Sequence, residues 1–252
     1  MTGRASAAKD ILGVWLGDPH SGADHGLTLP KLAKNDRQAW LAEVFQDITK
    51  RIRAEARGKR LHVHLGGDMV HLPGDDDARE LAETLFRPIV AMADEAAAVA
   101  GTDYHVGEDG SDDRSIYRGL GIPRANIRVG TAYLTLGGRE IVWAHHGPRT
   151  GKRPHTELDG LDRTAEDAYR RSLEWGEPAP ALIVGHHVHQ ANGCIYRRGI
   201  WVATCPALAL SDSYAAKVAF NSRPTIGALV YYPGPNKPDI WPYAIPRRFV
   251  SA

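Results

Sequence analysis

The sequence carries almost no excess charge. Lysine and arginine total 31 and aspartate and glutamate total 30, so the formal net charge at pH 7 is only +1. A protein that holds nucleic acid along its phosphates usually carries a strong basic excess. That excess is absent here, so any nucleic-acid substrate would have to be held locally.

Cysteine and long apolar runs are also scarce. The two cysteines, Cys194 and Cys205, lack the CxxC spacing of a metal-binding motif. The sequence shows neither a signal peptide nor an apolar run long enough to cross a membrane. We therefore expect a reduced, soluble, cytoplasmic protein with no membrane partner.

Histidine is abundant instead, with twelve residues. Nearly all of them follow or lie within short apolar runs, whereas solvated histidines would be scattered along the chain. The hydrophobic content of 43% is enough for one sizeable core. No linker or internal repeat divides the chain, so we expect a single domain over residues 1–252.

The apolar runs predict alternating strands and helices, followed by hairpins. Strands are expected at 11–17, 61–68 and 96–101, with helices at 36–58 and 77–94 between them. From residue 126 the chain predicts a hairpin turning at Gly137-Gly138, a helix near 161–175, a strand at 181–189 that runs into histidines, and further strands at 194–205 and 225–233. This pattern predicts an α/β sandwich of two mixed β-sheets flanked by helices.

Four of the apolar runs end in side chains that can bind metal. These are Asp18 and His20, then Asp68, then His145 and His146, and finally His186, His187 and His189. Side chains at the carboxyl ends of neighbouring strands meet in space in an α/β sheet. Carboxylates combined with imidazoles suit manganese, iron, zinc or similar ions, whereas an all-oxygen set would indicate magnesium or calcium. A folding requirement gives no reason for the same chemistry at four strand ends, so the pattern predicts a metal site with a catalytic function.

The order of these blocks resembles the calcineurin-like metallophosphoesterases. DPH at 18–20, GGD at 66–68, HH at 145–146 and GHHVH at 185–189 are similar to that family's Asp-x-His, Gly-Asp, His and Gly-His-x-His blocks. DPHSGADHGLTLP, GTDYHVG at 101–107 and HHGP at 145–148 resemble, more narrowly, the phage- and prophage-encoded members. The resemblance implies the sandwich fold and hydrolysis of a phosphate ester. For a phage-encoded member it also implies the host cytoplasm.

The resemblance further implies two divalent metal ions. We expect manganese, with iron, zinc, nickel and magnesium as alternatives. Two cations neutralise an anionic phosphate and lower the pKa of a shared water. By resemblance, Asp68 bridges the ions and takes part in catalysis, Asp18, His20 and one histidine of the last block hold the first ion, and His145 and another histidine of that block hold the second.

Two choices of register remain open in the histidine blocks. In 186–189 we favour His187 and His189, because residues two apart in an extended chain face the same side and need no bulge. The rival pair is His186 with His189. Likewise we favour His145 over His146, because the preceding strand leads straight into it.

One block departs from the family pattern. Residues 101–105, Gly-Thr-Asp-Tyr-His, stand where the family has Gly-Asn-His-Asp/Glu, so the metal-binding asparagine is missing. Thr102 or Asp103 are candidate replacements, and His105 is the candidate catalytic group beside the leaving oxygen. The basic residues of the loop after His145 are expected to bind the anionic substrate, with a solvated loop as the alternative: Arg149, Lys152 and Arg153.

These features favour a phosphodiesterase acting on a nucleotide or on DNA or RNA. The alternative is a weakened or inactive protein that keeps the fold and binds metal or nucleic acid. The sequence leaves monoester against diester, the physiological substrate and the oligomeric state open.

Overall fold

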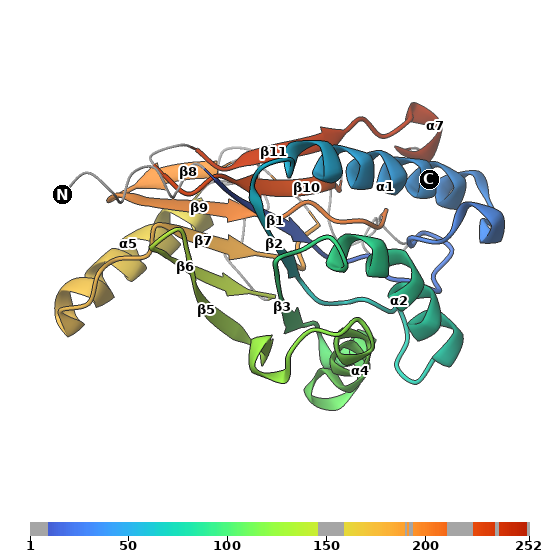
Figure 1. The fold of residues 1–252 in the computed structure, drawn as a ribbon, viewed down its shortest axis with the longest axis horizontal. Coiled ribbons are helices and arrows are strands. Elements are labelled where there is room, and N and C mark those ends of the chain that lie inside the picture. The colour runs from blue at the N-terminus through green and yellow to red at the C-terminus, as the bar shows by residue number, and fades with distance from the viewer. Residues whose placement is uncertain are drawn as a thin grey trace.

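Two β-sheets pack face to face in the computed structural model, and helices cover their outer faces (Figure 1). The structure describes residues 10–145, 159–189, 191, 194–210, 224–234 and 237–250. Within these residues, no helix is both long enough and apolar enough to span a membrane.

The first sheet has six strands in the order β11-β10-β1-β2-β3-β4. Their bounds are Ile11–Leu16 (β1), Arg60–Leu65 (β2), Glu95–Ala100 (β3), Ile127–Val129 (β4), Ile226–Tyr231 (β10) and Asp239–Tyr243 (β11). β1 to β4 run parallel, whereas β10 runs antiparallel to both β1 and β11. All six residues of β1 and of β10 are buried, which explains why these strands are continuous apolar runs.

The second sheet has five strands in the order β5-β6-β7-β9-β8. Their bounds are Thr131–Leu136 (β5), Arg139–Ala144 (β6), Leu182–Gly185 (β7), Cys194–Arg197 (β8) and Ile200–Thr204 (β9). The three central strands β6, β7 and β9 run parallel, and β5 and β8 are antiparallel at the edges. Gly137 and Gly138 both have positive φ in the tight turn between β5 and β6, as a two-residue hairpin requires.

Helices of more than two turns lie on the outside of both sheets. They are α1 (Asp36–Glu55), α2 (Asp76–Val90), α4 (Ser111–Gly119) and α5 (Asp159–Trp175). Shorter helical segments are η1 (Pro30–Leu32), α3 (Asp103–Val106), η2 (Glu108–Gly110), η3 (Arg124–Asn126) and α7 (Arg247–Val250). Asn35 and Asp75 cap α1 and α2 by accepting backbone N–H groups, and these caps define where the helices begin.

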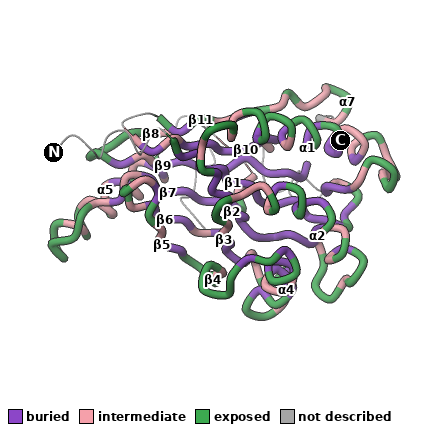
Figure 2. Tube along the Cα trace, in the orientation of Figure 1, coloured by how far each residue is buried: buried purple, intermediate pink, exposed green. Residues whose placement is uncertain are grey.

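Three clusters of buried side chains form the layers of the core. One packs α1, α2 and α4 against the first sheet, and includes Phe45, Ile48 and Phe86. The second lies between the two sheets and includes Trp15 and Trp143. The third packs α5 against the second sheet. The central strands β1, β2, β7, β9 and β10 are correspondingly buried along most of their length, whereas the edge strands β4, β5, β8 and β11 are not (Figure 2).

The predicted fold class is confirmed, with differences in individual elements. β2 ends at Leu65, earlier than the expected 68, and α2 ends at Val90 instead of 94. Residues 127–129 form a strand of the first sheet rather than the start of the hairpin in the second. The sequence analysis did not anticipate α4 or β11, which span only nine and five residues.

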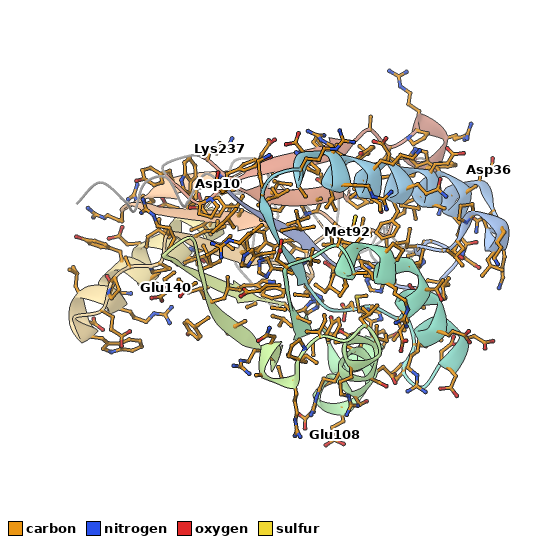
Figure 3. The ribbon with its side chains drawn as sticks, in the orientation of Figure 1. Asp10, Asp36, Met92, Glu108, Glu140 and Lys237 are labelled. Atoms are coloured by element: carbon orange, nitrogen blue, oxygen red, sulfur yellow. The ribbon has the colours of Figure 1, made fainter. Side chains whose placement is uncertain are left out.

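The two sheets present the carboxyl ends of their parallel strands at the same end of the sandwich. Asp10, just before β1, and Glu140, near the start of β6, both lie on the left of Figure 3, so β1 and β6 start from the same side. Beyond the strands, Leu208 donates a backbone hydrogen bond to Gly17 after β1, and His145 after β6 contacts Gly66 after β2. Loops from both sheets therefore meet at one edge.

Candidate metal centre

The loops at this edge carry six of the predicted site residues. They follow β1 (Asp18 and His20), β2 (Asp68), β6 (His145) and β7 (His187 and His189). Nitrogen and carboxylate atoms of these residues gather in two groups of three, each with its ligand atoms within 4.8 Å of one another. The strand ends that the sequence analysis singled out are therefore brought together.

The first group consists of Asp68, His145 and His187. The Oδ2 atom of Asp68 lies 3.2 Å from Nε2 of His145 and 3.8 Å from Nδ1 of His187. His145 donates its Nδ1–H to the carbonyl of Gly66 at 2.5 Å, which turns its other nitrogen towards Asp68. Metal-binding histidines are commonly oriented by such a bond to a backbone carbonyl.

The second group consists of Asp18, His20 and His189. The Nε2 atoms of the two histidines are 3.1 Å apart, and Nε2 of His189 lies 3.8 Å from Oδ1 of Asp18. Oδ1 of Asp18 is buried and has no hydrogen-bond partner among the described residues. A buried carboxylate oxygen costs free energy unless a donor or a cation satisfies it. The donor set of both groups, carboxylate with imidazole, fits manganese, iron or zinc.

The backbone of the site is unusually strained. Seven residues other than glycine have positive φ among the described residues, and five of them belong to the two groups: Asp18, His20, Asp68, His187 and His189. Such conformations cost of order 1–3 kcal/mol each, and they persist where the surrounding structure holds them for a function. The concentration of strain at these five residues supports a functional role for the loop ends.

His187 and His189 reach the two groups by a route that the sequence analysis did not foresee. Their φ values are +70° and +54°, so the chain is not extended there, and the two rings go to different groups. The argument from an extended chain was therefore wrong in its geometry. The choice of His187 and His189 as ligands remains a prediction.

His186 occupies a different environment from its neighbours. Its ring is buried and packs against the backbone of Gly17 and Gly66, where an added Cβ would collide with it. Its Nδ1 lies 3.5 Å from Oδ2 of Asp18, and burial lowers its pKa. His186 is therefore placed to orient the carboxylate of Asp18.

Thr102 fixes the orientation of Asp68. Its backbone N–H and its hydroxyl both donate to Oδ1 of Asp68, at 2.7 and 3.0 Å. Oδ2 is thereby left facing the two histidines. Gly101 makes this approach possible, because an added Cβ would collide with Asp68. Asp103, the other candidate to replace the missing asparagine, is exposed and belongs to none of the groups of ligand atoms among the described residues.

A pair of buried residues on α4 supports the loop around Asp68. Asp113 accepts the backbone N–H of Met69 at 3.0 Å and that of Gly101 at 2.8 Å. The hydroxyl of Tyr117 accepts the N–H of Gly67 at 3.1 Å. The sequence analysis missed both residues, since no motif marks them and α4 was not predicted. Burial, helped by the negative charge of Asp68, raises the pKa of Asp113 to about 7.

Asp68 and His145 change each other's pKa. Burial alone would raise the pKa of Asp68, but hydrogen bonding with His145 and His187 and the charges of His145 and His20 hold it well below its usual value. Burial likewise opposes the charged form of His145, yet the Asp68 carboxylate raises its pKa to about 9. In the metal-free protein a proton on His145 therefore balances the carboxylate. A cation can take over that role.

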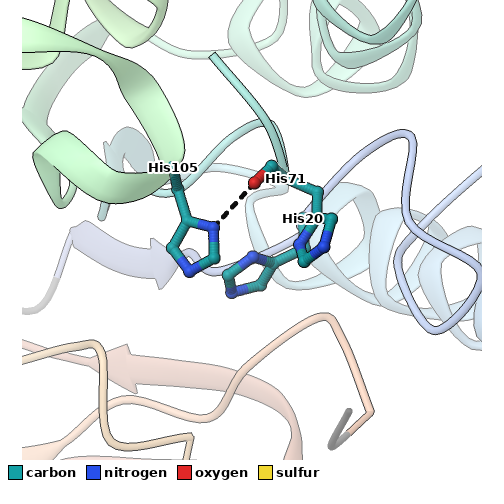
Figure 4. A group of neighbouring side chains, drawn as sticks. All are labelled: His20, His71 and His105. Carbon is teal, nitrogen blue, oxygen red and sulfur yellow. Dashed lines mark hydrogen bonds between the residues drawn. The ribbon is translucent and has the colours of Figure 1, made fainter. Parts of the chain in front are cut away.

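His105 lies beside the second group, together with His71. Nitrogen atoms of His20, His71 and His105 form a third group within 4.8 Å (Figure 4). His105 donates its Nδ1–H to the backbone carbonyl of His71 at 2.8 Å, so its Nε2 is available for other contacts. The sequence analysis did not single out His71.

The predicted substrate-binding residues cannot be placed. Arg149, Lys152 and Arg153 lie outside the described residues, and so does His146, the alternative to His145. Their assignments remain predictions.

No protein-family model matches this sequence, and no curated protein matches it. Among solved structures, an archaeal phosphodiesterase matches with a TM-score of 0.50 and 8% sequence identity, over 92% of this chain and 100% of that chain. A dimetal phosphatase from Danio rerio matches with a TM-score of 0.47 and 10% identity, over 93% and 99% of the two chains. A Vps29 single mutant from Entamoeba histolytica matches with a TM-score of 0.45 and 14% identity, over 93% and 100%.

The likeness to the archaeal phosphodiesterase concerns the fold. Two mixed sheets flanked by helices are the α/β sandwich of the metallophosphoesterases.

Proposed function

We propose that this protein is a metal-dependent phosphoesterase that hydrolyses a phosphodiester of a nucleotide or nucleic acid. The observation that carries the proposal is the pair of carboxylate–histidine groups, each with a buried carboxylate, at the edge where both sheets end their parallel strands. Fold alone does not define an activity, so the argument rests on these side chains.

One ion would be held by the Asp18 group, which consists of Asp18, His20 and His189. The other would be held by His145 and His187, with Asp68 as the bridge between the two ions. Two divalent ions, for which we propose manganese, would neutralise the phosphate charge and lower the pKa of a water that attacks it. Asp68 suits the bridging role because Thr102 holds its Oδ1 and leaves Oδ2 towards the histidines.

His105 is the proposed proton donor to the leaving oxygen. The bond from its Nδ1–H to the carbonyl of His71 fixes the ring, so a proton on Nε2 would be held at a defined position. A donor must lie within hydrogen-bond reach of the leaving group, and His105 lies at the side of the second group, 4.5 Å from the His20 ring between ring centres. The basic loop with Arg149, Lys152 and Arg153 is proposed to bind the substrate phosphate.

The test is metal-dependent hydrolysis of simple phosphate esters. Protein stripped of metal with a chelator is assayed with bis-p-nitrophenyl phosphate and p-nitrophenyl phosphate, before and after manganese is added. We expect activity that depends on manganese, that rises beyond one equivalent of ion, and that is higher on the diester. Absence of hydrolysis across manganese, iron, zinc, nickel and magnesium would refute the proposal.

A metal-binding protein without turnover is the second candidate. The observation in its favour is Thr102, which stands in place of the missing asparagine. Both its backbone N–H and its hydroxyl donate hydrogen bonds to Asp68. Calorimetry separates the two functions, because the second candidate would bind manganese without hydrolysing either ester.

A further inference from the structure

A histidine cluster adjoins the proposed two-metal site but is not required by it. His20, His71 and His105 come from the loops after β1, β2 and β3, and their ligand nitrogens lie within 4.8 Å of one another. The ring centres of His20 and His105 are 4.5 Å apart, and those of His71 and His105 are 5.4 Å apart. The proposed hydrolysis uses the side chains of His20 and His105, but from His71 it uses only the backbone carbonyl that holds His105.

We propose that His20, His71 and His105 bind a third divalent ion, of the kind that prefers imidazole ligands, with zinc as the principal candidate. The other two groups each contain a carboxylate, whereas this group consists of imidazoles alone. Imidazole sites favour zinc, copper and nickel over manganese and magnesium. The chemistry of the donors therefore separates this site from its neighbours.

The geometry of the cluster suits such an ion. Zinc bonds to nitrogen of about 2.1 Å in a tetrahedron place two ligand nitrogens about 3.4 Å apart, so small ring rotations would close the site. His105 is already oriented, because its Nδ1–H is held by the carbonyl of His71 and its Nε2 is the remaining nitrogen (Figure 4). Histidines that bind metal commonly donate their other ring N–H to a backbone carbonyl in this way.

The cluster is also accessible from outside. His71 lines a cavity of about 800 Å³ whose wall includes His25, Asp24 and Asp36. A hydrated cation could enter through this cavity, because its two carboxylates outnumber the one arginine of its wall, Arg37. An ion can thus reach His71 without passing between the two proposed catalytic ions.

The shared histidine gives the third ion a consequence for activity. His20 belongs both to this cluster and to the group with Asp18 and His189. Zinc on the cluster would compete for His20 with the catalytic ion of the Asp18 group. It would also occupy Nε2 of His105, the proposed proton donor. We infer that excess zinc inhibits the manganese enzyme, and this part of the inference rests on the proposed function.

The first experiment counts zinc without any substrate. Metal-free protein is equilibrated with a small excess of zinc and analysed for zinc per chain by elemental analysis. We expect His71→Ala and His71→Gln to bind one ion fewer than the unmodified protein. His25→Ala is the control, because it removes an imidazole 5.1 Å from the His71 ring without removing a member of the cluster. Circular dichroism verifies that each variant is folded.

Equal zinc counts in the unmodified protein and in both folded His71 variants would overturn the site. Loss of the same ion in His25→Ala would overturn the assignment to these three histidines. Because this count needs no turnover, it stands or falls separately from the proposed phosphoesterase activity.

The second experiment measures zinc inhibition of manganese-dependent hydrolysis. His71→Ala retains the backbone carbonyl that holds His105, and relative to its own rate without zinc it should require about tenfold more zinc for half-inhibition. The same inhibition in the unmodified protein and in His71→Ala would overturn the competition for His20.

Discussion

The two candidate ligand groups differ in how firmly the protein holds them. Asp68 receives two hydrogen bonds from Thr102, and the Nδ1 of His145 is held by Gly66. In the other group, two imidazole nitrogens approach to 3.1 Å, and Asp18 accepts a longer hydrogen bond, from the backbone N–H of His187 at 3.3 Å. Oδ1 of Asp18 and Oδ2 of Asp68 both have no hydrogen-bond partner among the described residues. The Asp68 carboxylate is therefore held more firmly before metal arrives, and an ion would satisfy one oxygen in each group.

This difference shows that preorganisation and ligand number are separate properties. The Asp68 group is better oriented, but it is the one that would lose the family's asparagine. The Asp18 group has its full predicted set of three residues, but its two histidines are hydrogen-bonded to each other in the metal-free protein, and an ion would have to replace that bond. Three sets of measurements test how far this contrast extends.

The largest effect is expected from Asp68→Asn. The change removes one negative charge from the centre of both proposed ion sites while keeping the shape of the side chain. Charge stabilisation by such sites is worth several kcal/mol, so we expect activity to fall about 1000-fold or more. Initial rates at saturating manganese measure it, and a cooperative thermal transition demonstrates that the variant folds.

Asp103→Asn is the matched control for that variant. Asp103 is exposed at the start of α3 and belongs to none of the described ligand groups, so near-normal activity is expected. If Asp68→Asn retained most of its activity, the central role of Asp68 would be wrong. If Asp103→Asn lost as much, Asp103 would be the substitute for the missing asparagine.

The next effect concerns the histidines that follow β7. His187→Ala should lose one bound manganese ion, because its Nδ1 is part of the Asp68 group. His186→Ala should keep both ions with weaker binding, about 10–100-fold, since residues that orient metal ligands have effects of that size. Elemental analysis after dialysis measures both variants. The reverse result would establish the bulged register with His186 as the ligand.

The smallest effect is a pH dependence of the metal-free protein. The pKa of His145 is raised to about 9 by Asp68, against an ordinary value of 6.5 in the unfolded chain. The folded state therefore binds the proton more tightly, and this stabilisation is complete below pH 6.5 and is lost as the pH rises through 9. The unfolding temperature of the metal-free protein should fall over that interval.

His145→Gln should flatten this pH dependence, because glutamine cannot be charged. Saturating manganese should flatten it too, since the ion displaces the proton. An unchanged slope in the variant would show that other groups dominate the titration. In that case the ion pair between His145 and Asp68 would not be the electrostatic centre of the better-held group.

The sequence carried much of the fold because β1, β7 and β10 are apolar runs whose ends are marked by glycine or polar residues. It also indicated which strand ends carry metal-binding side chains. It could not indicate the grouping of those side chains, because positive φ at His187 and His189 turns their rings to different groups. Local patterns describe a strand up to its last residue, and the loop beyond depends on tertiary contacts.

The sequence could not indicate the residues that support the site, for a related reason. Asp113 and Tyr117 act through backbone N–H groups of distant loops, and such contacts leave no spacing pattern in the chain. His71 belongs to a cluster assembled from three separate loops. Its position in the sequence, after Val70 and before Leu72, carries no hint of that neighbourhood.

The glycines behind the site have a consequence for how such a protein can change. At Gly17 and Gly66 a single added carbon would meet the ring of His186, and at Gly101 it would meet Asp68. These glycines have no side chain that could bind metal, yet the space beside them sets where His186 and Asp68 lie. Related proteins could therefore differ over most of their surface and still keep glycine at these three positions, because one added methyl group would displace His186 or Asp68.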